Sequence, residues 1–215
     1  MKKIAVVLAG NGVYDGAEIH ESTLTLLAIA RQGASYQCFA PDINQAHVIN
    51  HITGEEMQEK RNVMVEAARI ARGNIKPLSE YKTTDFDAII FPGGFGAAKN
   101  LCNFAFNGAD CTVNADVEKA IKETVASGKP IGALCISPVI MAKVLGEVKL
   151  TIGQDKSTAD AIQSMGATHV TTNHGEIVVD EKLKLVTTPC YMLDANIVQI
   201  EEGASNVVAK ILEIA

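Results

Sequence analysis

The chain contains no tryptophan, and aromatic residues make up only 5% of its 215 residues. Positive charge is also scarce: 19 lysines and arginines stand against 25 aspartates and glutamates, which gives a formal net charge of −6. No basic surface is therefore expected that would bind nucleic acid or an anionic membrane. Apolar runs long enough to span a bilayer are absent as well.

The remaining composition, 47% hydrophobic and 20% charged residues, is typical of a compact globular protein. The sequence has no internal repeat and no low-complexity linker, and a chain of this length can bury one full core. We therefore expect a single domain over residues 1–215.

Cysteine spacings typical of disulfide frameworks or metal sites are also missing. The five cysteines form no CxxC motif, and their number is odd: Cys38, Cys102, Cys111, Cys135 and Cys190. Unpaired cysteines of this kind fit a reducing compartment. The first apolar run ends at Gly10 and is too short for a signal peptide. Together these two observations predict a cytoplasmic protein. Cys102 and Cys111 flank one loop and could approach each other, which the sequence alone does not decide. The five histidines lack ligand spacing, so no metal site is expected.

Short β-like runs alternate with helical patterns, which indicates an α/β protein with a doubly wound parallel sheet and helices on both faces. Strands are expected at 4–9, 36–40, 87–91, 130–134 and 184–188, and helices at 18–32, 58–72, 114–127, 137–145, 157–165 and 194–213. A small hairpin is expected near residues 176–187, and a long excursion at about 41–80. Ligands of such sheets bind outside the carboxyl ends of the strands.

The stretch Gly132–Pro138 predicts a buried strand that turns sharply into a helix at Cys135. This pattern predicts a nucleophile elbow, which requires small residues two positions before and after the nucleophile; here they are Ala133 and Ser137. A thiol at a helix N-terminus is expected to have a lowered pKa, because the helix dipole and free N–H groups favour the thiolate. The alternative is a buried structural cysteine.

The loop Gly10–Gly16 follows the first strand and leads into a helix, but its spacing does not match the dinucleotide-binding motif. Asn11 in this loop is a candidate substrate-binding residue. Glu18 is a candidate partner carboxylate for Cys135; alternatively, it only complements the helix dipole. Glu21, one turn further, shares the same helix face and is the reserve candidate.

Paired glycines follow the strand at 87–91. Gly93 and Gly94 would let backbone N–H groups approach a ligand closely, so the N–H groups of Gly94 and Ile136 could form an oxyanion hole. The alternative is a tight turn without a binding role.

Two further residues are weaker candidates. His174 belongs to a His-x-Glu arrangement that class I glutaminases pair with an elbow cysteine, but it precedes the hairpin and is more simply explained as a turn residue. Cys190, in the loop after the last core strand, either lines the site or is a packed thiol.

Three stretches carry a resemblance to a known family: residues 13–21 (VYDGAEIHE), 92–101 (PGGFGAAKNL) and 186–193 (VTTPCYML). Together with the elbow, they make the whole chain resemble the ThiJ/PfpI class I glutamine amidotransferase-like superfamily, and within it the ElbB family of isoprenoid biosynthesis proteins with an amidotransferase-like domain. The resemblance implies a flavodoxin-like fold, a homodimer, Cys135 as nucleophile and Glu18 as its partner. Many superfamily members have a histidine directly after the cysteine, whereas this chain has Ile136.

The resemblance also implies a glyoxalase that converts glyoxal, or a similar small dicarbonyl, to a 2-hydroxy acid such as glycolate without metal, glutathione or redox cofactor. Two alternatives remain at this point. An activated thiol beside a carboxylate also suits a redox-responsive or binding protein. A glutaminase-like subunit would require His174 to reach Cys135.

Overall fold

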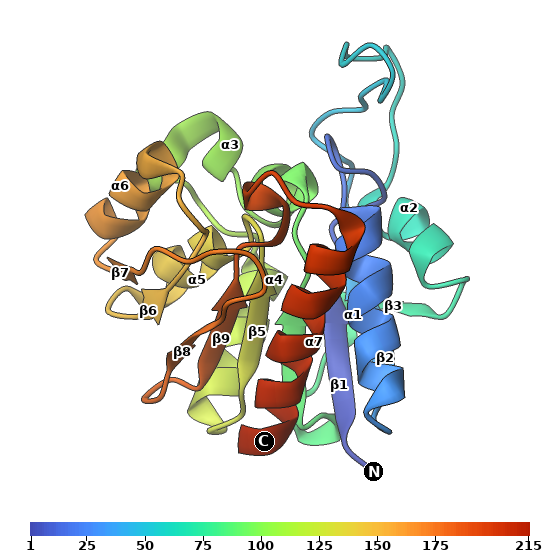
Figure 1. Ribbon diagram of the computed structural model, residues 1–215. Coiled ribbons are helices and arrows are strands. Elements are labelled where there is room, and N and C mark those ends of the chain that lie inside the picture. Colours follow the sequence, from blue (N-terminus) through green and yellow to red (C-terminus); the bar gives the residue numbers. More distant parts are fainter.

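A computed structural model describes all residues, 1–215 (Figure 1). Its main sheet has seven strands in the order β3-β2-β1-β4-β5-β9-β8, and two further strands, β6 and β7, form a small separate sheet. The strands are β1 (Lys3–Val7), β2 (Ser35–Ala40), β3 (Ile75–Pro77), β4 (Ala88–Phe91), β5 (Ile131–Leu134), β6 (Lys149–Leu150), β7 (Thr168–His169), β8 (Val178–Asp180) and β9 (Leu185–Thr188).

Helices connect the strands. The α-helices are α1 (Ile19–Arg31), α2 (Val63–Ile70), α3 (Phe104–Asn107), α4 (Ala115–Ala126), α5 (Pro138–Leu145), α6 (Lys156–Ser164) and α7 (Ile197–Ile214). Short 3₁₀ turns are η1 (Leu78–Glu80), η2 (Thr83–Asp85), η4 (Gly108–Asp110) and η5 (Cys190–Met192), and η3 (Ala97–Leu101) is a π-helix. None of the helices combines the length and apolarity needed to cross a membrane.

The central strands β2-β1-β4-β5-β9 are parallel, and they follow the strand order of a flavodoxin-like sheet. Helices α1 and α7 pack side by side on one face, and α4 and α5 pack together on the other (Figure 1). Because both faces are covered, β4, β5 and β9 are buried along their whole length, which explains why β4 and β5 contain no polar side chain.

The predicted fold class is confirmed. All five predicted strands and six predicted helices are present, although α2 begins five residues later than expected. The predicted hairpin is also present, because β8 pairs antiparallel with β9. Strands β3, β6 and β7 were not expected, because two or three residues are too few to show an alternating pattern.

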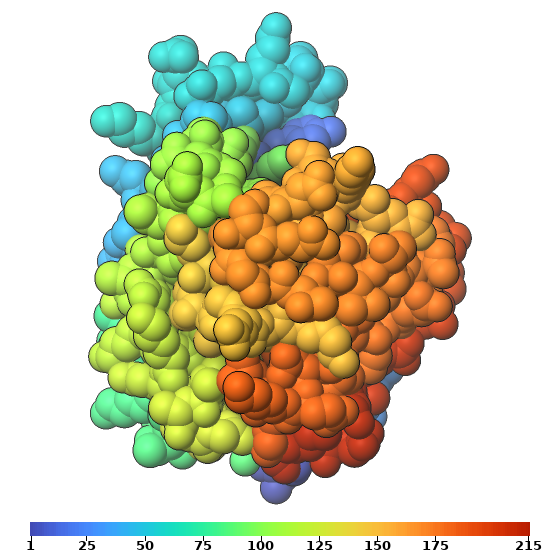
Figure 2. Space-filling model, turned by 90° about the vertical axis from the view of Figure 1, so that its left-hand side faces the viewer, coloured from blue at the N-terminus to red at the C-terminus, as the bar shows by residue number.

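The first part of the excursion, residues 41–62, forms an arm that rises from the body at the carboxyl end of the sheet (Figures 1 and 2). Its two halves run antiparallel, and Gln45 donates its N–H to the Arg61 carbonyl at 2.8 Å. At its tip Ile52 is 96% exposed. The Ile49 N–H donates to the Asp15 carboxylate at 2.7 Å, which ties the arm to the loop after β1.

Candidate active site

The turn between β5 and α5 has the backbone of a nucleophile elbow. Cys135 adopts a φ of 60°, in the left-handed region that non-glycine residues avoid at a cost of about 1–2 kcal/mol. Its N–H donates to the Thr188 carbonyl at 3.0 Å, and the Ser137 hydroxyl donates to the Pro92 carbonyl at 2.8 Å. These two bonds tie the elbow to the neighbouring strand ends on both sides, so they help to hold Cys135 in its strained conformation.

The carboxyl group in contact with the Cys135 sulfur is that of Glu21 on α1, which is fully buried. Glu21 also accepts the N–H of Gly93 at 2.9 Å and the N–H of Tyr191 at 3.2 Å. The loops after β4 and β9 therefore fix the Glu21 carboxyl, which reaches the Cys135 sulfur between them.

Glu18 has a different position from the one predicted for it. It is the N-cap of α1, with extended backbone angles, and its carboxylate accepts the Glu21 N–H at 2.7 Å. The helix begins at Ile19 and not at Glu18, so the Glu18 side chain folds back onto the first turn. The structure thus gives the contact with Cys135 to the reserve candidate, Glu21.

The burial of this pair changes its proton affinities. Burial, reinforced by the nearby charge of Glu18, raises the pKa of Glu21 to about 7. Burial and the charge of Glu21 also raise the pKa of the Cys135 thiol well above its ordinary value, although the N–H groups of Gly94 and Ile136 act in the opposite direction. The expectation of a lowered thiol pKa is therefore wrong, because desolvation and a neighbouring carboxyl outweigh the helix terminus.

The predicted glycine pair lies against the sulfur. A Cβ on Gly93 would come within 2.4 Å of the Cys135 Cβ and 2.6 Å of a Glu21 carboxyl oxygen, so only glycine fits. Gly94 adopts a φ of 97°, and its N–H and that of Ile136 both favour the thiolate form of Cys135. The two N–H groups predicted for an oxyanion hole therefore both act on the sulfur.

A cavity of about 400 Å³ reaches Cys135, Gly94 and Ile136 from the surface. Most of its wall is apolar. The apolar residues come from the loops after β1 and β4 and from η3, α3 and η5: Val13, Phe95, Ala98, Phe104, Ala105 and Met192. Its polar residues are Asp155 and Thr158 at the start of α6, and Tyr191. Figure 2 shows α3 in green and α6 in orange adjoining each other on this side of the molecule. A ligand of a few heavy atoms would fit here.

Of the other predicted residues, Asn11 and His174 do not line this cavity. His174 lies at the turn before β8 and lines a separate surface hollow with Glu176 and Glu202. Cys190 is buried next to the pair: burial raises its pKa strongly, with further contributions from Glu21 and Cys135. Its backbone φ of 43° is strained like that of Cys135.

Sequence reasoning missed Tyr191. Its N–H holds Glu21, its ring lines the cavity, and its hydroxyl lies 2.8 Å from Nδ1 of His20. The only sequence signal was its place in the loop after the last core strand, where ligands of such sheets bind.

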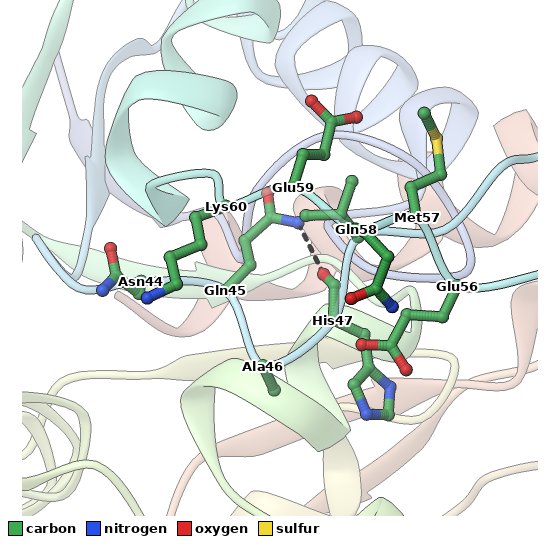
Figure 3. A pocket seen from close by; sticks show the side chains of 10 residues that line it. Asn44, Gln45, Ala46, His47, Glu56, Met57, Gln58, Glu59 and Lys60 are labelled. Atoms are coloured by element: carbon green, nitrogen blue, oxygen red, sulfur yellow. Dashed lines mark hydrogen bonds between the residues drawn. The ribbon is translucent and has the colours of Figure 1, made fainter.

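A second cavity, of about 360 Å³, lies within the arm (Figure 3). It is lined by residues 44–48 and 56–60, and Gln45 spans its edge by donating to the His47 carbonyl at 3.0 Å. No cysteine, serine or threonine lines this cavity, whereas the cavity at Cys135 combines a thiol with a buried carboxyl group. The protein has no group of three or more histidine, cysteine, aspartate or glutamate side chains arranged to hold a metal ion.

Comparison with known proteins agrees with this geometry. The model of the DJ-1/PfpI family matches residues 2–192. The chain belongs to the DJ-1/PfpI family. Within the family it is 47% identical to the human "Glutamine amidotransferase-like class 1 domain-containing protein 3, mitochondrial", over 99% of this chain and 83% of that protein. It is 46% identical to the rat "ES1 protein homolog, mitochondrial", over 99% and 84%.

Solved structures of DJ-1/PfpI proteins give the same fold. An isoprenoid biosynthesis protein with an amidotransferase-like domain from Ehrlichia chaffeensis superposes with a TM-score of 0.92 at 33% identity, covering 99% of this chain and all of that one. Glyoxalase III from Candida albicans superposes with a TM-score of 0.63 at 15% identity, covering 99% and 97%, a likeness that shows the fold alone.

These comparisons contradict the predicted cytoplasmic location, because the curated relatives are named mitochondrial proteins. The prediction relied on unpaired cysteines, which indicate a reducing compartment but do not separate one reducing compartment from another.

Proposed function

We propose that this DJ-1/PfpI protein is a cysteine-dependent, cofactor-free glyoxalase that converts glyoxal or a similar small dicarbonyl to a 2-hydroxy acid such as glycolate. The observation that carries the proposal is the buried contact between the Glu21 carboxyl and the Cys135 sulfur, open to a cavity of about 400 Å³. This reaction needs one nucleophile and one group that can accept and return a proton.

In the first step the Cys135 sulfur forms a bond to one aldehyde carbon, and its thiol proton passes to the Glu21 carboxylate. The electron pair of the carbonyl double bond moves to oxygen, where the N–H groups of Gly94 and Ile136 stabilise the charge. These N–H groups already lie at the sulfur, so they are close to any carbon bonded to it. Return of the proton from Glu21 to that oxygen gives a hemithioacetal.

In the second step Glu21 removes the proton from the hemithioacetal carbon and delivers it to the neighbouring carbon. The hydroxyl proton of the first carbon passes to the oxygen of the second. The first carbon thus becomes a thioester and is oxidised, while the second becomes a hydroxymethyl group and is reduced. Water then cleaves the thioester, releasing glycolate and the thiol. A pKa of about 7 suits Glu21 to both halves of this transfer, since the group can accept and release a proton near neutral pH.

We assign the proton transfer to Glu21 and not to Glu18, whose carboxylate is held by the Glu21 N–H at 2.7 Å. In this proposal Glu18 caps α1 and acts on the site through its charge, which raises the pKa of Glu21.

The test is glycolate formation from glyoxal, followed by NMR without added glutathione or metal. Cys135→Ala should lose turnover, and Glu21→Gln should lower kcat by about 10²–10⁴-fold, the usual contribution of a general acid–base. Cys38→Ala, which removes a thiol buried in β2, is the matched control and should behave like the wild type. Wild-type turnover in Cys135→Ala would overturn the proposal.

A redox-responsive thiol at Cys135 is the second candidate, and the opening to the cavity together with the N–H groups of Gly94 and Ile136, which favour the thiolate, supports it. Mass spectrometry after mild peroxide treatment separates the two candidates: a sensor should accumulate sulfenic or sulfinic acid at Cys135 and turn over no aldehyde. The glutaminase alternative has no support in the geometry, because His174 lines a different cavity.

The homodimer implied by the family resemblance also stays a proposal. The exposed Ile52 at the tip of the arm is compatible with a contact between two copies. Light scattering coupled to size-exclusion chromatography would test it, and a mass of one chain at micromolar concentration would contradict it.

A further inference from the structure

A second pair of thiols lies outside the site at Cys135. Cys102 follows the π-helix η3, and Cys111 follows the 3₁₀ turn η4; both are buried and neither forms a disulfide. Their side chains are close enough for each to shift the pKa of the other. No step proposed for Cys135 uses them.

The backbone holds the two segments in antiparallel register. Cys102 pairs with Val113 in an isolated β-bridge, and the Asn103 N–H donates to the Thr112 carbonyl at 3.1 Å. The Thr112 N–H returns a bond to the Asn103 side-chain oxygen at 2.6 Å. In such a register Cys111 is a diagonal neighbour of Cys102, and its side chain points to the same side of the ladder as that of Val113. The contact between the sulfurs is thus fixed by backbone pairing on both sides.

The two sulfurs have different proton affinities. The hydrogen bond from Cys102, together with the positive charge of Lys143, lowers the pKa of Cys111 to about 7, against the opposing effect of burial. The contact with Cys111 and burial raise the pKa of Cys102. The Cys102 thiol therefore keeps its proton, which it can donate either to Cys111 or to the Ala97 carbonyl at 3.4 Å. The arrangement is that of a nucleophilic thiolate beside a protonated thiol.

Cys111 is buried, with 1% of its surface exposed, but it borders a cavity at the surface. A surface cavity of about 260 Å³ is lined by Cys111, Val113, Glu118 and Lys143. The Lys143 ammonium donates to the Ala109 carbonyl at 3.0 Å, which keeps its charge close to the loop that carries Cys111. The other buried thiols differ from Cys111: Cys38 lies within the sheet, where burial raises its pKa to about 12.

We propose that Cys102 and Cys111 are a redox-active pair that hydrogen peroxide converts to a disulfide, with Cys111 as the attacking thiol and Cys102 as the resolving thiol. The Cys111 thiolate attacks one peroxide oxygen, the O–O bond breaks, and the hydroxide that leaves takes up a proton to become water. The sulfur is now a sulfenic acid. The Cys102 sulfur then attacks the Cys111 sulfur, the S–O bond breaks, and the hydroxyl leaves as water with the Cys102 proton.

The pair is close in sequence to the wall of the cavity at Cys135. Ala98 in η3 and Phe104 in α3 line that cavity, and Cys102 lies between them in the chain. In the reduced protein the Cys102 thiol faces the first carbonyl of η3, that of Ala97. Disulfide formation would remove the Cys102 thiol as a donor to the Ala97 carbonyl. It would also link the segment between η3 and α3 covalently to the loop after η4.

The experiment treats Cys135→Ala protein with equimolar hydrogen peroxide at neutral pH, so that the elbow cysteine cannot contribute. Remaining thiols are blocked, and the products are examined by intact mass and by peptide mapping without reduction. We expect a species lighter by two hydrogens, in which the peptide containing Cys102 is linked to the peptide containing Cys111, and which dithiothreitol reverses. As a control, adding the Cys38→Ala substitution to the Cys135→Ala protein should leave this product unchanged.

Two further variants assign the roles. In the same background, Cys102→Ser should stop at a sulfenic acid on Cys111 that dimedone labels, whereas Cys111→Ser should resist oxidation at Cys102. Both variants can be checked for folding by circular dichroism before treatment. The proposal is overturned if folded protein forms no Cys102–Cys111 disulfide, or if Cys102 is oxidised equally fast in the Cys111→Ser variant.

Discussion

The raised pKa of Glu21 should make the free energy of unfolding depend on pH, because this carboxyl group is protonated in the folded protein at pH values where it is ionised in the unfolded chain. Its pKa is about 7 in the folded protein, against an ordinary value of 4.5. The folded state therefore binds a proton between these two values that the unfolded state does not. The free energy of unfolding is therefore highest below pH 4.5 and falls as the pH rises towards about 7.

The size of the effect follows from the same two values. The difference between a pKa of about 7 and one of 4.5 corresponds to about 3 kcal/mol, at about 1.4 kcal/mol for each tenfold change in proton affinity. Glu21→Gln removes the titrating group. The amide can accept only one of the two bonds from Gly93 and Tyr191, which costs about 1–3 kcal/mol independently of pH. The pH dependence, and not the absolute stability, is therefore the informative quantity.

Urea unfolding under reducing conditions, at intervals from about pH 5 to pH 8, measures it. The free energy of unfolding of the wild type should fall by about 3 kcal/mol relative to that of Glu21→Gln across this range. Glu118→Gln, which removes an exposed carboxylate paired with Lys122 on α4, is the control and should follow the wild type. Parallel curves for the wild type and Glu21→Gln would refute the assignment of a raised pKa.

Three other predictions concern the site and its frame. Glyoxal turnover should increase as the pH rises through about 7, because the Glu21 carboxylate must accept the thiol proton; a rate that falls over this range would contradict the proposed step. Gly93→Ala should abolish turnover and lower the free energy of unfolding by about 1–3 kcal/mol, because its Cβ would overlap Cys135; unchanged activity and urea midpoint would be incompatible with that contact. Arg72→Gly should raise the urea midpoint by relieving a φ of 52°, whereas Lys76→Gly in the extended strand β3 should lower it, and equal effects would show that strain at position 72 is negligible.

The sequence was sufficient for those parts of the molecule that long, regular patterns specify. The parallel strands around Cys135 are continuous apolar runs, and the helices between them repeat apolar residues every three or four positions, so their order and approximate limits could be predicted. The elbow could be predicted because its small flanking residues and the following Pro138 are local features.

The choice between Glu18 and Glu21 depended on one residue at the start of α1. With the helix starting at position 18, both carboxylates share one face; with the cap at Glu18, that side chain turns back and Glu21 alone faces Cys135. Helix ends are uncertain by one or two residues even in structures, so no sequence pattern separates these cases. The proton affinity of Cys135 was mispredicted for a related reason, because desolvation depends on distant segments that close over the thiol.

The Glu21 carboxyl is enclosed by chain segments that lie far apart in the sequence. The hydrogen bond from the Tyr191 N–H to this carboxyl spans 170 positions. A nascent chain that has emerged only as far as the elbow thus carries its cysteine without the loop that completes the enclosure. Until the last parallel strand docks, that sulfur stays open to water, where its acidity is that of an ordinary thiol. The contact between Glu21 and Cys135 is therefore completed late in folding, and a slower reaction of this thiol with a thiol-reactive dye should report it.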